Sequence, residues 1–256
     1  MTLSQQEASG GMPIISLRGI GKQFGAVRAL NNVDLEVREG EVVALVGDNG
    51  AGKSTMVKIM LGVFMPDSGE IRVRGQVQSF VTPADARAAG IETIYQDLAL
   101  AGNLSIGENI YLGREPMRRA FGFLPVMDRE AMHRAALNVT THLDIEIANP
   151  RRPLGNMSGG QRQAVAISRA IHWNARLLIM DEPTAALGVP EQRRVIELIK
   201  SLKMKGVSII IVSHNMNDVF EVADRIVVLL RGENAGNLVA AQTSHEEVVQ
   251  RMVRGA

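Results

Sequence analysis

The chain has 256 residues, 46% of them hydrophobic, and its 28 Lys and Arg nearly balance its 27 Asp and Glu, for a net charge of +1. A chain of this length can bury a large core, and the even charge argues against a protein whose main role is to coat nucleic acid. The absence of cysteine excludes disulfides and thiolate metal sites. No apolar run approaches the roughly 18–20 residues that cross a bilayer, so a membrane connection would come through a partner.

The chain begins with a polar stretch and a β-rich region. Its first eleven residues are largely polar, with no basic start and no apolar run, and we expect residues 1–12 to form a disordered lead-in. Residues 14–37 hold short β-rich pieces separated by glycines and an Asn-Asn pair. This composition is typical of antiparallel strands joined by turns.

Short, almost wholly apolar runs follow at Val42–Val46, Leu177–Met180, Val207–Val212 and Ile226–Leu230. Strands that are buried on both faces show such runs, as in a parallel sheet covered by helices. Helical patterns lie between and after them, at Lys53–Gly62, Arg129–Leu143, Gln161–Trp173, Pro190–Lys205 and His245–Val253. The sequence therefore predicts an α/β fold with a mainly parallel sheet, an N-terminal antiparallel β-subdomain and an α-helical subdomain inserted at about residues 97–157.

Residues that often bind ligands or take part in catalysis follow three of the apolar runs. Gly47 follows the first, Asp181 and Glu182 follow the second, and Ser213 and His214 follow the third. The carboxyl ends of strands in an open parallel sheet line the ligand crevice. We therefore expect these residues, which are far apart in the sequence, to meet at one site.

The stretch Gly47–Ser54 reads GDNGAGKS and fits the P-loop pattern G-x-x-x-x-G-K-[ST]. Backbone N–H groups of such a loop close around phosphate oxygens, and the positive end of the following helix points at them. Lys53 would reach the β- and γ-phosphates, Ser54 would offer its hydroxyl to Mg²⁺, and Thr55 would add a phosphate contact. The alternative is a glycine-rich turn, but the predicted strand before and helix after favour nucleotide binding. The predicted cofactor-binding residues here are Gly47, Asp48, Asn49, Gly50, Ala51, Gly52, Lys53, Ser54 and Thr55.

Two carboxylates come directly after the second apolar run. Asp181 would hold Mg²⁺ through its water shell, and Glu182 would polarise the attacking water as a general base. Acidic residues are also common in solvated turns after strands. The P-loop in the same chain favours the catalytic interpretation.

The string Met157-Ser-Gly-Gly-Gln161 marks another predicted helix start. Ser158 suits the N-cap, and Gly159 and Gly160 expose backbone N–H groups beside it, with Gln161 next. Because the P-loop already covers the γ-phosphate of one nucleotide, a second phosphate cradle makes sense if it serves a nucleotide held by another copy. A plain capped helix is the alternative for this string alone.

These three elements, in the chain order Gly47–Ser54, Met157–Gln161 and Asp181–Glu182, resemble the ATP-binding cassette (ABC) family over nearly the whole chain. The resemblance implies a P-loop NTPase core in a single ABC ATPase domain at residues 13–256. It also implies that ATP is sandwiched between two copies, with Lys53 from one copy and Ser158, Gly159 and Gly160 from the other.

The same resemblance assigns three further residues. Gln96 would contact Mg²⁺ or the lytic water and lie where a permease couples, and His214 would contact the γ-phosphate and position the catalytic base. Phe24 takes the place of the aromatic residue that stacks on adenine. Taken alone, Gln96 fits a solvated loop, His214 a helix cap and Phe24 the core, so their roles depend on the motif order.

Two positions depart from the family pattern. Met157 replaces the usual leucine, which is a tolerated change at constant volume. Gly188 replaces the usual aspartate of the loop after Asp181, and we expect looser communication between the two sites. The strings GDNGAGKST, EPTAALG, ENIYLGRE, SHNM and VFEVADRI are similar to ATPases of bacterial sugar importers of the ribose and fructose type. A single cassette is typical of the fructose-type members, so a homodimer would supply both sites.

The resemblance implies a peripheral ATPase on the cytoplasmic face of the inner membrane, bound to integral-membrane permease subunits and served indirectly by a periplasmic sugar-binding protein. A soluble ABC ATPase acting on nucleic acid or ribosomes is the first alternative. Such proteins tend to carry long coiled coils or tandem cassettes, and no heptad run lies between Lys53 and Ser158, so we expect no nucleic-acid partner. A regulatory module without turnover is the second alternative, against which Glu182 and His214 argue.

Overall fold

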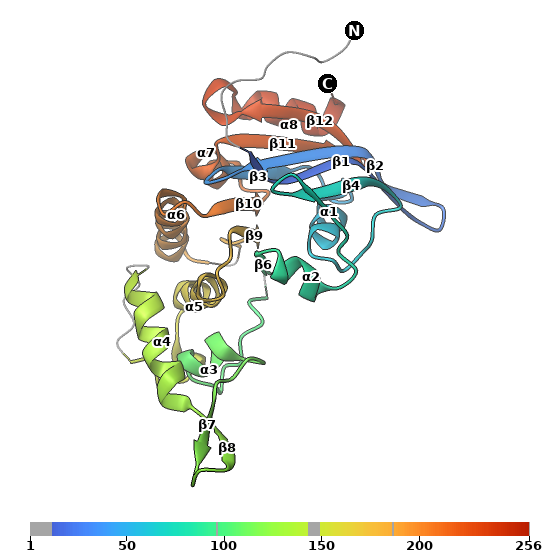
Figure 1. Cartoon of the computed structure of the whole chain (residues 1–256). Coiled ribbons are helices and arrows are strands. Elements are labelled where there is room, and N and C mark those ends of the chain that lie inside the picture. Colours follow the sequence, from blue (N-terminus) through green and yellow to red (C-terminus); the bar gives the residue numbers. More distant parts are fainter. Residues whose placement is uncertain (1–11, 96, 143–148, 186, 256) are drawn as a thin grey trace.

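A largely parallel sheet forms the centre of the computed structural model, which describes residues 12–95, 97–142, 149–185 and 187–255 (Figure 1). Its strand order is β12-β11-β3-β10-β9-β6, and β12 is antiparallel to β11. The strands are β3 (Val42–Val46), β6 (Ile91–Ile94), β9 (Leu177–Asp181), β10 (Ser208–Val212), β11 (Arg225–Leu230) and β12 (Glu233–Val239). β3 and β10 are buried along their whole length, as their apolar sequences predict.

An antiparallel sheet of order β2-β1-β4-β5 lies beside the central sheet (Figure 1). Its strands are β1 (Pro13–Phe24), β2 (Val27–Arg38), β4 (Ser68–Val73) and β5 (Gln76–Gln78). A cluster of buried side chains joins both sheets to helix α1 (Lys53–Met60). The N-terminal antiparallel β-subdomain and the mainly parallel sheet that the sequence predicts are thereby confirmed.

Helices cover the opposite face of the central sheet. Side chains of a strand alternate between faces, so Leu177 and Ile179 pack into the cluster around α1, whereas Leu178 and Met180 pack into a second cluster. The second cluster contains side chains from α5 (Gly159–His172) and α6 (Val189–Met204). A third cluster packs α7 (Met216–Val222) and α8 (His245–Arg254) on β11.

The chain between β6 and α5 projects away from the two termini (Figure 1). It contains α3 (Ile106–Tyr111), β7 (Met117–Ala120), β8 (Leu124–Met127), α4 (Arg129–His142) and the short 3₁₀ turn Leu154–Asn156. The sequence patterns predict helices here but not the β7–β8 hairpin, whose strands lack period-2 alternation and include Pro125. Two further short elements are α2 (Pro83–Ala88) and the 3₁₀ turn Ala240–Gln242.

Candidate functional site

The P-loop connects β3 to α1 and needs glycine at two positions. Gly47 and Gly52 have φ angles of 149° and 106°. A Cβ atom on Gly47 would overlap the carbonyl oxygen of Leu229, and one on Gly52 would lie 2.7 Å from the Leu30 side chain. Because α1 begins at Lys53, the free N–H groups of its first turn point into the loop, where they favour an anion.

The Lys53 side chain folds over this loop. Its Nζ atom donates hydrogen bonds to the carbonyl oxygens of Gly47 at 2.5 Å and Asp48 at 2.9 Å. Burial lowers the pKa of Lys53, and the nearby negative charges of Glu182, Asp48 and Asp181 oppose this shift. The ammonium group is therefore positioned beside the backbone N–H groups that suit phosphate oxygens.

The ends of β9 and β10 bring together Asp181, the predicted Mg²⁺ ligand, Glu182, the predicted base, and His214. Asp181 pairs with Val212 in the parallel ladder, and the Glu182 N–H donates to the Val212 carbonyl at 2.8 Å. The His214 Nδ1 atom lies 2.8 Å from Glu182 Oε1. Burial, and then the charge of Glu182, raise the pKa of Asp181. The strand ends thus hold two carboxylates and an imidazole at one edge of the sheet.

All of these groups line one cavity of about 890 Å³. Most of the predicted P-loop residues, both carboxylates and His214 are among its lining residues, whereas Ala51 is buried beneath the loop. The complete lining is Val27, Arg28, Ala29, Gly47, Asp48, Asn49, Gly50, Gly52, Lys53, Ser54, Thr55, Asp181, Glu182, Ala185, Val212, His214 and Met252. Val27 and Arg28 line the cavity but were not predicted from the sequence. The only feature of the sequence that could have indicated them is their position just after the Gly25 turn.

Some predicted residues lie elsewhere. Phe24 does not line the cavity, and its ring packs edge-on against Phe64 with 5.1 Å between centroids. Gln96 falls outside the described residues. Ser158, Gly159, Gly160 and Gln161 form the start of α5, away from the lining of this cavity.

The start of α5 has the geometry of a capping box. Ser158 Oγ accepts a hydrogen bond from the Gln161 N–H at 3.3 Å, and Gln161 Oε1 accepts one from the Ser158 N–H at 3.0 Å. Side chains of α6 and of the loop before it crowd the two glycines. A Cβ atom on Gly159 would lie 2.6 Å from Leu187, and one on Gly160 would lie 3.2 Å from Glu191.

Comparison with known proteins gives the same picture as the motifs. Residues 30–185 match the family model described as ABC transporter. The chain belongs to the ABC transporter family. This cassette is 45% identical to the xylose/arabinose import ATP-binding protein XylG of Sulfolobus acidocaldarius, with 93% of each chain covered. It is 48% identical to the fructose import ATP-binding protein FrcA of Rhizobium meliloti, with 84% of each chain covered.

The ABC cassette also matches solved structures. One is a dimeric ATP-binding cassette in a post-hydrolysis state with ADP and phosphate bound, which is 27% identical at a TM-score of 0.70. That alignment covers 88% of this chain and 98% of the solved one. The predicted P-loop NTPase fold is confirmed by this likeness.

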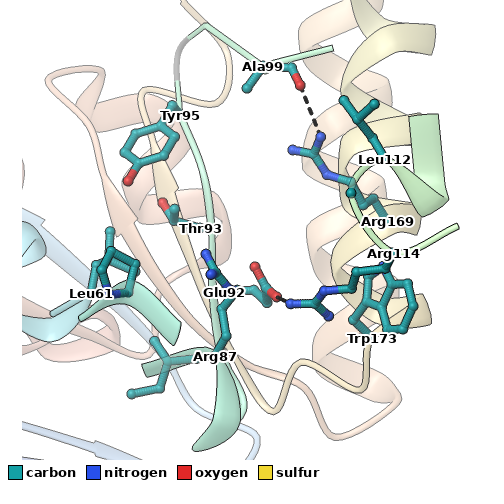
Figure 2. A pocket seen from close by; sticks show the side chains of 13 residues that line it. Leu61, Arg87, Glu92, Thr93, Tyr95, Ala99, Leu112, Arg114, Arg169 and Trp173 are labelled. Carbon is teal, nitrogen blue, oxygen red and sulfur yellow. Dashed lines mark hydrogen bonds and ion pairs between the residues drawn. The ribbon is translucent and has the colours of Figure 1, made fainter. Parts of the chain in front are cut away.

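A second cavity, of about 390 Å³, lies between the central sheet and the projecting segment (Figure 2). Arg114 reaches across it, with Nη2 3.9 Å from Glu92 Oε1 and its guanidinium 4.5 Å from the centre of the Trp173 ring. Arg169 donates to the Ala99 carbonyl at 3.0 Å. Burial raises the pKa of Glu92 and lowers that of Arg169. Tyr95, the neighbour of Gln96, lines the same cavity.

Proposed function

We propose that this cassette binds and hydrolyses ATP to power the import of a sugar through a membrane permease. The observation that carries the proposal is the cavity in which the P-loop, two carboxylates and His214 converge. The direction and the substrate class come from relatives named as sugar import ATP-binding proteins, at 45% and 48% identity over most of the chain.

The residues of the cavity have complementary roles in phosphoryl transfer. Lys53 and the N–H groups of the P-loop hold the phosphates, and Glu182 takes a proton from the attacking water while His214 holds its carboxylate in place. Val27 and Arg28 line the same cavity and offer contacts to the nucleoside. Catalysis then consists of positioning and charge stabilisation.

Mg²⁺ fits the same cavity. Ser54 and Asp181 both line it and both offer oxygen, the ligand that Mg²⁺ prefers. In the described residues no group of three or more His, Cys, Asp or Glu side chains is placed to hold a metal. When bound, the ion would neutralise charge on the phosphates, and we propose that Gln96 is a further contact.

Two copies of the cassette complete each site. Ser158 and the two glycines present a phosphate-binding helix end outside the cavity of their own chain. We propose that this end closes on the nucleotide bound to Lys53 of a second copy, and that Phe24 reaches the adenine only in that closed state. The dimeric cassette with ADP and phosphate supports this arrangement.

The permease is the proposed partner of the second cavity. No helix in the described residues has the length and apolar character to span a bilayer. The cavity between the central sheet and the projecting segment contains Glu92, Arg114 and Arg169 on its walls (Figure 2). Closure of two copies would move these walls and push on a cytoplasmic helix of a permease at the cytoplasmic face, while a periplasmic sugar-binding protein delivers the sugar.

The decisive experiment is reconstitution of the cassette with its permease and binding protein in vesicles. ATP hydrolysis should rise when the binding protein carries a transported sugar, and it should not rise with the Glu182→Gln cassette. Screening pentoses and fructose identifies the substrate. Stimulation by DNA, RNA or ribosomes instead of by sugar would contradict the proposal.

A further inference from the structure

The β7–β8 hairpin ends in two phenylalanines that point into solvent. The side chains of Phe121 and Phe123 are 90% and 79% exposed, and Met117 is also exposed nearby. The hairpin projects from the end of the molecule that is far from both termini (Figure 1). Large exposed apolar side chains grouped at one projecting tip mark an interaction surface.

The backbone conformation at this tip is unfavourable for phenylalanine. Phe121 has a φ angle of 51°, followed by Gly122 at 81°. Asn or Gly occupies left-handed turn positions at much lower cost than a bulky side chain. Folding of the hairpin therefore does not account for a phenylalanine at this position, and strained residues of this kind cluster at functional sites.

Positive charge flanks the aromatic tip. Residues 116–127 contain Arg118 and Arg119 and no acidic residue, and both arginines are exposed. The acidic residues nearest in the sequence, Glu115 and Asp128, flank this segment at the base of the hairpin and not at its tip. Aromatic side chains beside basic ones match an anionic membrane surface, where rings enter the interface and guanidinium groups contact headgroups.

The sequence of β8 disfavours a protein partner that adds a strand there. Pro125 has no backbone N–H to donate to an added strand. The hairpin follows directly on Leu112, Gly113 and Arg114, which line the cavity proposed for the permease. If that cavity meets a membrane protein, as the proposed function requires, the hairpin lies close to the same membrane.

We propose that the β7–β8 hairpin is a membrane-contact element that inserts Phe121 and Phe123 into the interface of an anionic bilayer while Arg118 and Arg119 bind its headgroups. The element adds a lipid contact to the permease contact. It helps to keep the projecting segment at the bilayer during the reopening of the dimer.

Vesicle sedimentation with the full chain tests the proposal in the absence of a permease. The wild-type chain should sediment with vesicles in which half of the lipid is phosphatidylglycerol, and poorly with phosphatidylcholine alone. The R118Q/R119Q variant should lose about thirtyfold in affinity for the anionic vesicles, and F121S/F123S should lose about a hundredfold. Both variants should keep the basal ATPase rate and the melting temperature of the wild type, because the hairpin lies outside the cavity.

Matched variants serve as controls. Met204 and Val253 are exposed apolar residues elsewhere, at 82% and 62%, and Arg193 and Arg194 form a second exposed arginine pair on α6. The M204S/V253S and R193Q/R194Q variants should bind within about twofold of the wild type. Equal losses in these controls would overturn the assignment to the hairpin.

A fluorescent probe separates lipid from the other possible partners. The chain has no cysteine, so Leu124→Cys can be labelled uniquely with an environment-sensitive dye. Its emission should shift to the blue on anionic vesicles alone and be quenched by lipid-attached quenchers. A probe that responds only to permease in detergent, or only to a second copy of the cassette, would overturn the proposal. That outcome would leave the proposed function standing, because sugar-stimulated ATPase activity tests the proposed function independently.

Discussion

The hydrogen bond between His214 and Glu182 joins the ends of two neighbouring strands. The Glu182 side chain is 19% exposed and that of His214 is 77% exposed, so the imidazole approaches the carboxylate from the open side of the cavity. Glu182 also has a left-handed backbone with a φ angle of 50°, and its N–H is held by Val212. These constraints direct one carboxylate oxygen toward the imidazole and leave the other for water.

Replacing Glu182 by Gln should nearly abolish hydrolysis, by about a hundredfold or more, because the amide cannot accept the proton of the attacking water. ATP should still bind, and the ATP-bound dimer should accumulate. Phosphate release and light scattering measure the two effects. Unchanged hydrolysis would refute the assignment of Glu182 as the base.

Replacing Asp181 by Asn should abolish hydrolysis and yet stabilise the nucleotide-free fold by a few degrees in melting temperature. Burial raises the pKa of Asp181, so the folded state loses stability as pH rises from the usual carboxyl range through the raised pKa. The gain from Asn should therefore be present at neutral pH and vanish in acid, where both side chains are neutral. A melting temperature that is lower than wild type at neutral pH would contradict this sign.

At the scale of elements, helices α3 and α5 both begin with a capping box. Ser105 and Glu108 form a capping box on α3, as Ser158 and Gln161 do on α5. The cap stabilises both helix starts, but only the start of α5 carries two glycines after the cap. Variants of these two caps therefore distinguish the effect of lost helix stability from the effect of a lost phosphate contact.

Replacing Ser158 or Ser105 by Ala should cost about 1 kcal/mol of unfolding free energy in each case, because each removes a cap. Only Ser158→Ala should also lower ATP turnover strongly, since we propose that its hydroxyl and the adjacent N–H groups contact the nucleotide of the second copy. Thermal denaturation and ATPase assays of the two variants test this. An equal loss of turnover in Ser105→Ala would show that the effect comes from stability alone.

At the scale of the whole molecule, the buried clusters on the two faces of the central sheet align its strand ends at one edge. This alignment brings the P-loop, Asp181, Glu182 and His214 into one cavity. The start of α5 is outside that cavity, and we propose that a second copy supplies it to complete the site.

Mixing two inactive variants tests this proposal. Chains with Lys53→Ala and chains with Ser158→Arg should each be inactive alone. In an equal mixture half of the dimers contain both variants, and each of these has one intact site, so activity should return to roughly a quarter of the wild-type rate if the sites act independently. ATPase assays at several mixing ratios measure the recovery, and a mixture as inactive as its components would contradict a shared site.

Several parts of the site could be predicted from the sequence because they depend on residues that are close along the chain. The P-loop needs glycine where φ is positive and a helix directly after it, and both are local properties of Gly47–Ser54. The apolar runs predict β3 and β10 because strands buried on both faces exclude polar residues. The convergence of three strand ends follows from the rule for parallel sheets.

Other features were decided only by tertiary structure. The packing of Phe24 against Phe64, the place of Arg28 in the cavity lining and the exposed hairpin tip each depend on contacts between elements that are distant in sequence. The sequence by itself determined which groups can bind phosphate and act as a base, since backbone conformation and side-chain chemistry are local. Which of these groups face one another was decided by the burial of both faces of the central sheet, because that packing sets the position of every strand end and helix start.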